Sequence, residues 1–335
     1  MIWENMKNSL LADLDTRVRA EADPASMDSL CNLADTFFRR FAAEDMHGRS
    51  VDNLYGCLQY LLEIMRPPLD EGPRLLIFNP ELHKHGWESA RTVLVVHCRG
   101  IPFVTASLRG EINRRNLPIR VIASTNLAVQ RDTDGSLTEV LGHSEDAEEH
   151  LPSEALVYFE FSRHSRPEAL DELRQTLLDI LAEVEVVVDD FAAISARLDD
   201  VVAMIGASEC AETDLRDEAA AFLVWLRQHH MTLLGYEYLE VDRSGPRPLV
   251  SASQEGRLGL LRFRQTRGVA DLEADLASMP DEELQRRQLS FSKSRLRSRV
   301  HRLTYPDYVE VREFNAAGEV VGQHRFIGLY TSSVY

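Results

Sequence analysis

The 335-residue sequence predicts an α+β protein built from N-terminal helices and two successive α+β parts. Helical patterns come first, and strand and helix patterns then alternate along the chain. In the middle of the chain the order is strand, helix, hairpin strands, strand and helix. That order is typical of a ferredoxin-like sandwich, in which helices lie on one face of a mixed or antiparallel sheet.

The first part, residues 1–68, is predicted to be helical. Apolar side chains recur at helical spacing in MDSLCNLADTFFRRF and in VDNLYGCLQYLLEIM, so each helix has one apolar side that needs a partner surface. The stretch PPLDEGP then interrupts the chain with three prolines and a glycine. We therefore expect a boundary at this point.

The second part, residues 69–205, carries the sandwich pattern. RTVLVVHC is an almost continuous apolar, β-branched run, as expected of a strand covered on both faces. A helix with Val104, Leu108 and Ile112 on one side follows, then two strands around the turn DTDG, the strand EALVYFEFSR and a second helix. VEVVVDDF, at 184–191, fits either a strand or a continuation of that helix.

The third part, residues 206–335, is predicted to be a second α+β unit. TDLRDEAAAFLVWLRQHH has a helical apolar face, acidic residues in its first turn and two histidines at its end. MTLLGYEYLEVD reads as a strand. The last 29 residues look like two strands joined by a turn at NAAG.

Composition excludes several classes of protein. The formal net charge of −17 argues against nucleic-acid binding, which depends on summed positive charge. The four cysteines lie far apart, as in a cytoplasmic protein with reduced thiols, and neither a disulfide framework nor a metal site is expected. No stretch has the length and apolarity of a membrane span or a secretion signal.

The sequence lacks the common catalytic signatures. GxGxxG, GxxxxGK[ST], GxSxG and HExxH are all absent, so no catalytic or cofactor-binding residue is predicted. His83 and His85 form an HxH pair, which we interpret as exposed loop histidines. His97 and Cys98 end a buried strand and are interpreted as core residues. The acidic run SEDAEEH is interpreted as a solvated loop.

The turn CRGIP is the first candidate binding site. It joins the buried strand to the next helix, where a glycine lets a ligand approach backbone amides at a helix N-terminus. The candidate effector-binding residues are Arg99, Gly100, Ile101, Pro102 and Phe103. The alternative interpretation is an ordinary turn glycine.

A basic run near the C-terminus is the second candidate site. Arg286 to Arg302 contains seven Lys or Arg and no acidic residue. In a strand, alternate side chains share one face. That face would carry Lys293, Arg295, Arg297, Arg299 and His301. Such a ladder of cations repels itself unless an acidic surface or anion faces it. It is therefore either a docking surface or a solvated basic face.

Several segments resemble the N-terminal region of the large bacterial NAD-specific glutamate dehydrogenases. They are HGWESARTVLVVHCRGIPFVTASLRGEINRRNLPI, YFEFSRHSRPEALDELRQTLLDIL, WLRQHHMTLLGYEYLE, RLGLLR and, most specifically, SKSRLRSRVHRLTYPDYVEVREFNAAGEVVGQHRFIGLYTSSVY. The resemblance runs from about residue 27 to the C-terminus. It implies an ACT-like domain at 69–205 and a PAS-like domain at 206–335.

The resemblance also implies a function. A parent enzyme of this family deaminates L-glutamate oxidatively to 2-oxoglutarate and ammonia with NAD, and the segments seen here precede its catalytic domain. The chain would then be a non-catalytic regulatory and oligomerisation region without a cofactor of its own. Its expected partners are its own catalytic domain, identical subunits and an amino-acid effector, with no nucleic acid and no membrane.

One departure from the family keeps two alternatives open. Gly100 and Ala106 stand where an aspartate is common in the family. The chain could instead be a free-standing amino-acid-sensing protein of the ACT type, or a purely structural assembly module that has lost its ligand.

Overall fold

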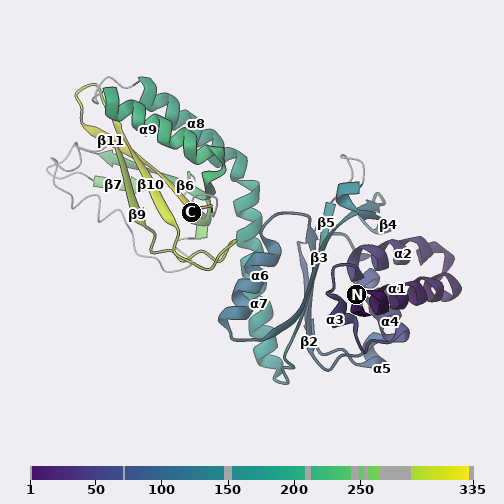
Figure 1. Ribbon diagram of the computed structural model, residues 1–335. Coiled ribbons are helices and arrows are strands. Elements are labelled where there is room, and N and C mark those ends of the chain that lie inside the picture. Colours follow the sequence, from purple (N-terminus) through teal and green to yellow (C-terminus); the bar gives the residue numbers. More distant parts are fainter. Residues whose placement is uncertain are drawn as a thin grey trace. The chain divides into compact units, whose positions relative to one another are not determined.

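The computed structural model describes residues 2–70, 72–146, 153–207, 213–242, 249–252, 256–263 and 288–331. The chain divides into two compact units, Met1–Leu181 and Ala182–Tyr335 (Figure 1). Each unit combines helices with an antiparallel sheet, so the expected α+β class is confirmed. The expected division at 68/69 and 205/206 stays a prediction.

The first unit contains the N-terminal helices and a five-stranded sheet. Its helices are α1 (Ile2–Glu21), α2 (Pro24–Phe38), α3 (Ala43–Met46), α4 (Val51–Met65), α5 (Leu82–His85), α6 (Val104–Arg114) and the first part of α7 (Pro167–Asp189). Its strands are β1 (Arg74–Phe78), β2 (Thr92–Arg99), β3 (Ile119–Arg131), β4 (Leu137–His143) and β5 (Ser153–Phe161), with a 3-10 turn η1 (Ser144–Asp146). The predicted order of strand, helix, hairpin, strand and helix is present from β2 to α7.

The sheet of the first unit has the order β1-β2-β5-β3-β4, with every neighbouring pair antiparallel. Strands β2 and β3 therefore run parallel to each other, with β5 inserted between them and α6 connecting them. This inserted arrangement is the split βαβ unit of ferredoxin-like folds. Strand β1, which comes before the unit in sequence, occupies the edge next to β2.

Helices cover both faces of this sheet, whereas the sequence predicted helices on one face only. Helices α6 and α7 lie on one side, and α1, α2 and α4 lie on the other (Figure 1). Phe37 of α2 packs in one apolar cluster with Val95 of β2 and Tyr158 of β5. The amphipathic N-terminal helices thus find their partner surface on the second face. Accordingly, seven of the eight residues of β2 are buried, as its continuous apolar run predicted.

The ambiguous segment VEVVVDDF is helical as far as Asp189. Helix α7 continues through it because Leu177, Leu181, Val184 and Val187 keep a helical spacing on one buried side. Tertiary burial here overrides the strand preference of the β-branched residues.

The second unit places two helices on one face of its sheet. Its elements are the second part of α7, α8 (Phe191–Ala207), α9 (Thr213–Trp225), η2 (Leu226–His230), β6 (Met231–Asp242), β7 (Leu249–Ala252), β8 (Leu258–Gly259), η3 (Leu260–Phe263), β9 (Leu289–Lys293), β10 (Asp307–Phe314) and β11 (Val320–Tyr330). The sheet order is β7-β6-β11-β10-β9, with β8 also paired to β6. Helices α8 and α9 pack against Tyr236, Val309 and Phe326. The predicted helix, strand and C-terminal strand pair are all present, and the finer PAS-like assignment stays a prediction.

The crossing of α4 over the loop at Gly86 gives a stability prediction. A Cβ atom at Gly56 would overlap with the Gly86 carbonyl oxygen, a backbone atom that cannot rotate away as a side chain can. Gly56→Ala should therefore lower the free energy of unfolding by about 1–3 kcal/mol, as overpacking of a core does.

The matched control is Gly206→Ala in α8, where an added Cβ meets no atom within 4 Å. Alanine is the better helix former, so this variant should be as stable as wild type or more stable by up to about 1 kcal/mol. Chemical denaturation of the two variants measures both effects. If the Gly56→Ala and Gly206→Ala variants were equally stable, the overpacking predicted at Gly56 would be contradicted.

Candidate effector site

The CRGIP turn leaves β2 at Arg99 and leads into α6 at Val104. The Gly100 amide donates to the Ser153 carbonyl at 2.8 Å, and the Ile101 amide donates to the Arg99 carbonyl at 2.9 Å. A Cβ atom on Gly100 would lie 2.9 Å from the Ser153 carbonyl oxygen. This glycine therefore serves the close approach of the turn to the start of β5. A ligand at the turn would have to bind mainly through side chains, and the effector site stays a prediction.

A hollow of about 570 Å³ adjoins this turn. Arg99, Gly100 and Ile101 line it, together with Arg131, Glu154 and residues of the loop after α4 and of the β3–β4 turn. Pro102 and Phe103 lie farther along the turn, and Phe103 takes a left-handed conformation with φ 73° directly before α6. The Arg99 side chain is exposed and the Arg131 side chain is mostly buried, so the hollow has two cationic groups.

A buried ion network forms the floor of the hollow. Arg131 of β3 donates through Nε and Nη2 to both carboxylate oxygens of Glu154, at 2.6 and 2.8 Å. On the other side, His97 Nε2 lies 2.6 Å from Glu154 Oε2. Arg131 also donates to the carbonyl oxygens of Met65 at 3.1 Å and Gly135 at 2.7 Å. One guanidinium thus joins the end of α4, the β3–β4 turn and strand β5.

The electrostatics of this network fix its charge state. Burial would raise the pKa of Glu154, but hydrogen bonds from Arg131 and His97 outweigh it and lower the pKa to about 2. Burial is the largest effect on His97 and lowers its pKa, against the raising effect of Glu154. At neutral pH the network therefore consists of a carboxylate held by an arginine and a neutral imidazole.

A second carboxylate on the same face of β5 secures the other end of the sheet. Glu160 accepts hydrogen bonds from Arg49 at 2.8 Å, Arg91 at 3.0 Å and the Tyr158 hydroxyl at 2.7 Å. Burial, followed by the charge of Glu160, raises the pKa of Tyr158 well above its usual value, so the hydroxyl stays a donor. Glu154 and Glu160 therefore hold the N-terminal helical layer and the sheet together at two points.

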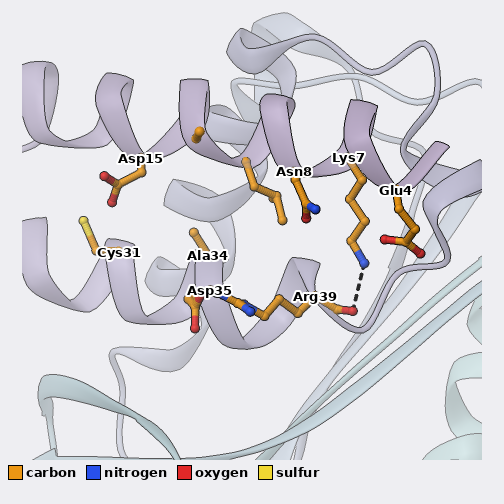
Figure 2. Close-up of a pocket in the computed structure, with 10 residues that line it drawn as sticks. Glu4, Lys7, Asn8, Asp15, Cys31, Ala34, Asp35 and Arg39 are labelled. Carbon is orange, nitrogen blue, oxygen red and sulfur yellow. Dashed lines mark hydrogen bonds and ion pairs between the residues drawn. The ribbon is translucent and has the colours of Figure 1, made fainter. Parts of the chain in front are cut away.

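Another hollow, of about 660 Å³, lies between α1 and α2 (Figure 2). Lys7 reaches from α1 to the end of α2, where Nζ donates to the carbonyl oxygens of Arg39 at 3.0 Å and Phe41 at 2.7 Å. The Cys31 thiol faces Asp15 across the groove, and burial together with Asp15 raises its pKa. A protonated thiol is a poor nucleophile. The groove thus shows interhelical packing contacts rather than a reactive site.

The basic run forms a strand only as far as Lys293, so the extended strand predicted to His301 is wrong beyond that point. Buried and exposed side chains nevertheless continue to alternate after Lys293, with Leu296 and Val300 buried and Arg295 and Arg297 exposed. The reason is local hydrogen bonding by the intervening serines. Ser294 Oγ accepts from the amide of Leu296 at 2.9 Å, and Ser298 Oγ accepts from the amide of Val300 at 3.1 Å.

Two cations of the run pair within their own unit. Lys293 Nζ lies 2.7 Å from an oxygen of Asp307 on β10. Arg299 donates through Nε and Nη2 to the two oxygens of Glu183 on α7, a carboxylate that is almost fully buried. His301 takes a positive φ of 64° and turns the chain. The five side chains therefore do not form the predicted single face. Arg295 and Arg297 are exposed, and the docking role stays a prediction.

Other residues considered from the sequence have local structural roles. His83 and His85 lie in the short helix α5, with the His83 side chain 73% exposed. Among the described residues, no group of three His, Cys, Asp or Glu is placed to hold a metal ion. Within the same ranges, no helix has the length and apolarity needed to cross a membrane. Cys210 and residues 147–150 of the acidic run lie outside the described residues.

Comparisons with known proteins point to one family. The family model for the glutamate dehydrogenase ACT1 domain matches residues 33–177, which include the five strands of the first unit and the residues that line the hollow beside Arg99. The NAD-specific glutamate dehydrogenase of Halomonas elongata is 34% identical over 336 residues, covering 99% of this chain and 21% of the relative. The Pseudomonas aeruginosa enzyme is 30% identical over 327 residues, covering 96% and 20%.

The chain belongs to the large NAD-specific glutamate dehydrogenases, as part of their N-terminal region. It spans about a fifth of the length of the relatives that it matches. A solved structure titled as an RNA-binding light-oxygen-voltage receptor covers 86% of this chain and 84% of its own, at 10% identity and a TM-score of 0.17. That likeness is too low to support an argument about fold or function.

The buried ion pair of this glutamate dehydrogenase region gives a second prediction. Glu154→Gln leaves the Arg131 guanidinium buried without its counter-charge, so the free energy of unfolding should fall by about 3 kcal/mol. Chemical denaturation measures the loss. The control is Asp35→Asn, which breaks the exposed Asp35–Arg39 pair and should change stability little. A Glu154→Gln protein as stable as the control would contradict the role given to the pair.

His97 gives a prediction of pH dependence. Its pKa is lowered in the folded chain, whereas the unfolded chain takes up the proton near its ordinary value of 6.5. The corresponding stability is complete above pH 6.5 and is lost as the pH falls through the folded-state pKa. His97→Gln, which keeps a donor toward Glu154, should therefore lose less stability than wild type between pH 7.5 and 5.5.

Thermal denaturation across that pH range measures the difference in slope. The exposed His83→Gln variant is the control and should follow the wild-type profile. His301 and His324, whose pKa values are also lowered, remain in all three proteins and cancel in the comparison. Parallel profiles for His97→Gln and wild type would contradict a buried, neutral His97.

Proposed function

We propose that the chain is the regulatory and oligomerisation region of a large NAD-dependent glutamate dehydrogenase. The observation that supports this proposal best is the extent of the match with the relatives. They match almost the whole of this chain, but about four-fifths of their own length lies outside the match. Catalysis in the parent, oxidative deamination of L-glutamate to 2-oxoglutarate and ammonia with NAD, is assigned to that remainder. The chain itself is proposed to be non-catalytic, to hold no cofactor and to act in the cytoplasm.

The proposed effector is an amino acid bound in the hollow beside Arg99. An amino acid offers a carboxylate and an ammonium group, and the hollow has cations in Arg99 and Arg131 and anions in Asp70 and Asp134. Binding would act by population shift, favouring one arrangement of paired ACT-like units that the catalytic part senses. The stiff floor made by Arg131 and Glu154 supports this idea, because a rigid site loses little conformational entropy on binding.

The proposed partners are the chain's own catalytic domain and identical subunits. The exposed Arg295 and Arg297 would face acidic surface on such a partner, in a chain whose net charge of −17 makes acidic surface abundant. Nucleic acid and membranes are not among the proposed partners.

A purely structural module is the second candidate. The observation that favours it is the use of the Gly100 and Ile101 amides within the chain, which removes two of the backbone donors that a ligand at the turn could use. It differs from the first candidate in predicting that no amino acid binds.

The test of the proposed function is ligand-dependent thermal stability of the chain, measured with the twenty amino acids. A ligand that binds only the folded state must raise the unfolding temperature. We expect one amino acid to do so in a saturable way, and Arg99→Ser to lose the effect. The control Arg109→Ser removes an exposed arginine of α6 and should keep it.

Assembly is measured on the same samples by light scattering. The proposed function predicts a mass above that of one chain and no NAD reduction with L-glutamate. No thermal shift with a stable oligomer would favour the structural module. A monomer that binds no amino acid, or one that oxidises glutamate by itself, would contradict the proposal.

A further inference from the structure

The second unit has a polar row on the sheet face opposite α8 and α9. Val309 and Val311 of β10 pack toward those helices, so Glu310 and Arg312 point to the other face. Across the strands, Arg312 pairs in register with Gln323 of β11, and the Arg312 amide donates to the carbonyl of Gln288, next to β9, at 2.9 Å. Gln288, Arg312 and Gln323 therefore form one row across three strands.

The neighbouring row on the same face is a chain of alternating charges. Arg325 Nε donates to Glu310 at 2.8 Å, and Arg257 Nε donates to Glu237 at 3.2 Å. Ser290 donates to Glu310 at 3.2 Å. All four charged side chains are buried. Their charges cancel in pairs.

Several buried polar atoms on this face have no hydrogen-bond partner among the described residues, and four of them belong to Gln288, Gln323 and Arg325. These four are Gln288 Oε1, Gln323 Oε1, Gln323 Nε2 and Arg325 Nη1. Gln323 is only 1% exposed, so water does not reach its amide from bulk solvent. Arg325 Nη1 lies 3.6 Å from Glu237 Oε1, a distance that makes an ion pair but is too long for a hydrogen bond. An unsatisfied buried polar group costs about 1–3 kcal/mol, so four together are unusual.

Two of the four atoms are acceptors and two are donors. A ligand that satisfies them must therefore offer both acceptors and donors. A carboxylate accepts from Gln323 Nε2 and Arg325 Nη1, and an adjacent ammonium or hydroxyl donates to the two amide oxygens. The guanidinium of Arg312, between the two glutamines, adds positive charge that favours a carboxylate. Neighbouring strands lie about 4.8 Å apart, so a row from β9 to β11 suits only a small molecule.

We propose that this face of the second unit binds a small 2-amino or 2-hydroxy carboxylic acid through Gln288, Gln323 and Arg325. Gln288, at the edge strand, is half-buried, and the row runs inward from there to the fully buried Gln323. The site is separate from the hollow beside Arg99, which lies in the first unit. It gives the second unit a sensing role of its own.

The experiment uses the 335-residue chain and matched ligands. L-alanine, L-aspartate and L-glutamate represent the amino acids, each compared with its 2-hydroxy analogue and with the acid that has hydrogen at C2. Thermal shift and isothermal titration give the affinity for each compound. We expect one 2-substituted acid to bind saturably and its C2-unsubstituted partner to bind about tenfold more weakly or worse, from loss of the bonds to the amide oxygens.

Gln323→Leu removes two of the unpartnered atoms. It should abolish this binding while leaving the ligand-free unfolding temperature unchanged or higher, because no existing hydrogen bond is lost. Gln323→Met serves the same purpose if the leucine variant does not fold. Gln130→Leu, on an exposed position of β3, is the control and should bind as wild type does.

The outcomes separate this inference from the proposed function. Binding that survives Arg99→Ser and is lost in Gln323→Leu supports the site in the second unit. Binding lost in Arg99→Ser but kept in Gln323→Leu overturns it and leaves the proposed effector hollow standing. Absence of binding by every compound also overturns it, since water alone would then satisfy the row.

Discussion

The Arg131–Glu154 pair is the contact on which the first unit most depends. A buried carboxylate is tolerated only when donors surround it, and here Arg131 and His97 supply them at 2.6 to 2.8 Å. The same guanidinium satisfies carbonyl oxygens at the end of α4 and in the β3–β4 turn. The N-terminal helices, the hairpin and the central strand β5 are therefore positioned by one group. The hollow beside Arg99 takes its shape from that positioning.

The second unit uses buried charge differently. Its alternating row from Glu310 to Arg257 is internally balanced, but the row next to it contains amide groups without protein partners. A buried polar network whose hydrogen bonds are all made mainly specifies one arrangement of strands. Buried polar groups without a protein partner indicate instead that another molecule binds them, which is the basis of the proposed ligand site. This chain accounts for about a fifth of the length of the NAD-specific glutamate dehydrogenases that it matches, and the proposed regulatory role rests on these two buried polar networks.

Much of the fold was predictable because its elements are strongly periodic. The continuous apolar run of β2 indicated a strand buried on both faces, and α2 and α4 were found from their apolar sides. The edge strand β1 was not found, because five residues between prolines and a loop give a weak pattern.

The ion network of the candidate site could not be predicted from the sequence. The partners of Glu154 lie 23 and 57 residues away from it along the chain, so no local pattern shows that they come together. A glutamate at the start of the apolar run EALVYFEF was the available signal. In the basic run, alternation was predicted correctly, but serine side chains replaced the strand hydrogen bonds after Lys293.

The central claim is that this region senses a small carboxylic acid and passes the signal to a catalytic part. Amide hydrogen exchange of the longer parent enzyme, with and without an amino acid that alters its rate, tests that claim most directly. The account predicts slower exchange on ligand binding at 97–103 and 153–160, at 288–293 and 320–330, or at both pairs of segments. Unchanged exchange at all four segments, with an altered rate of glutamate oxidation, would place the sensing elsewhere and contradict the account.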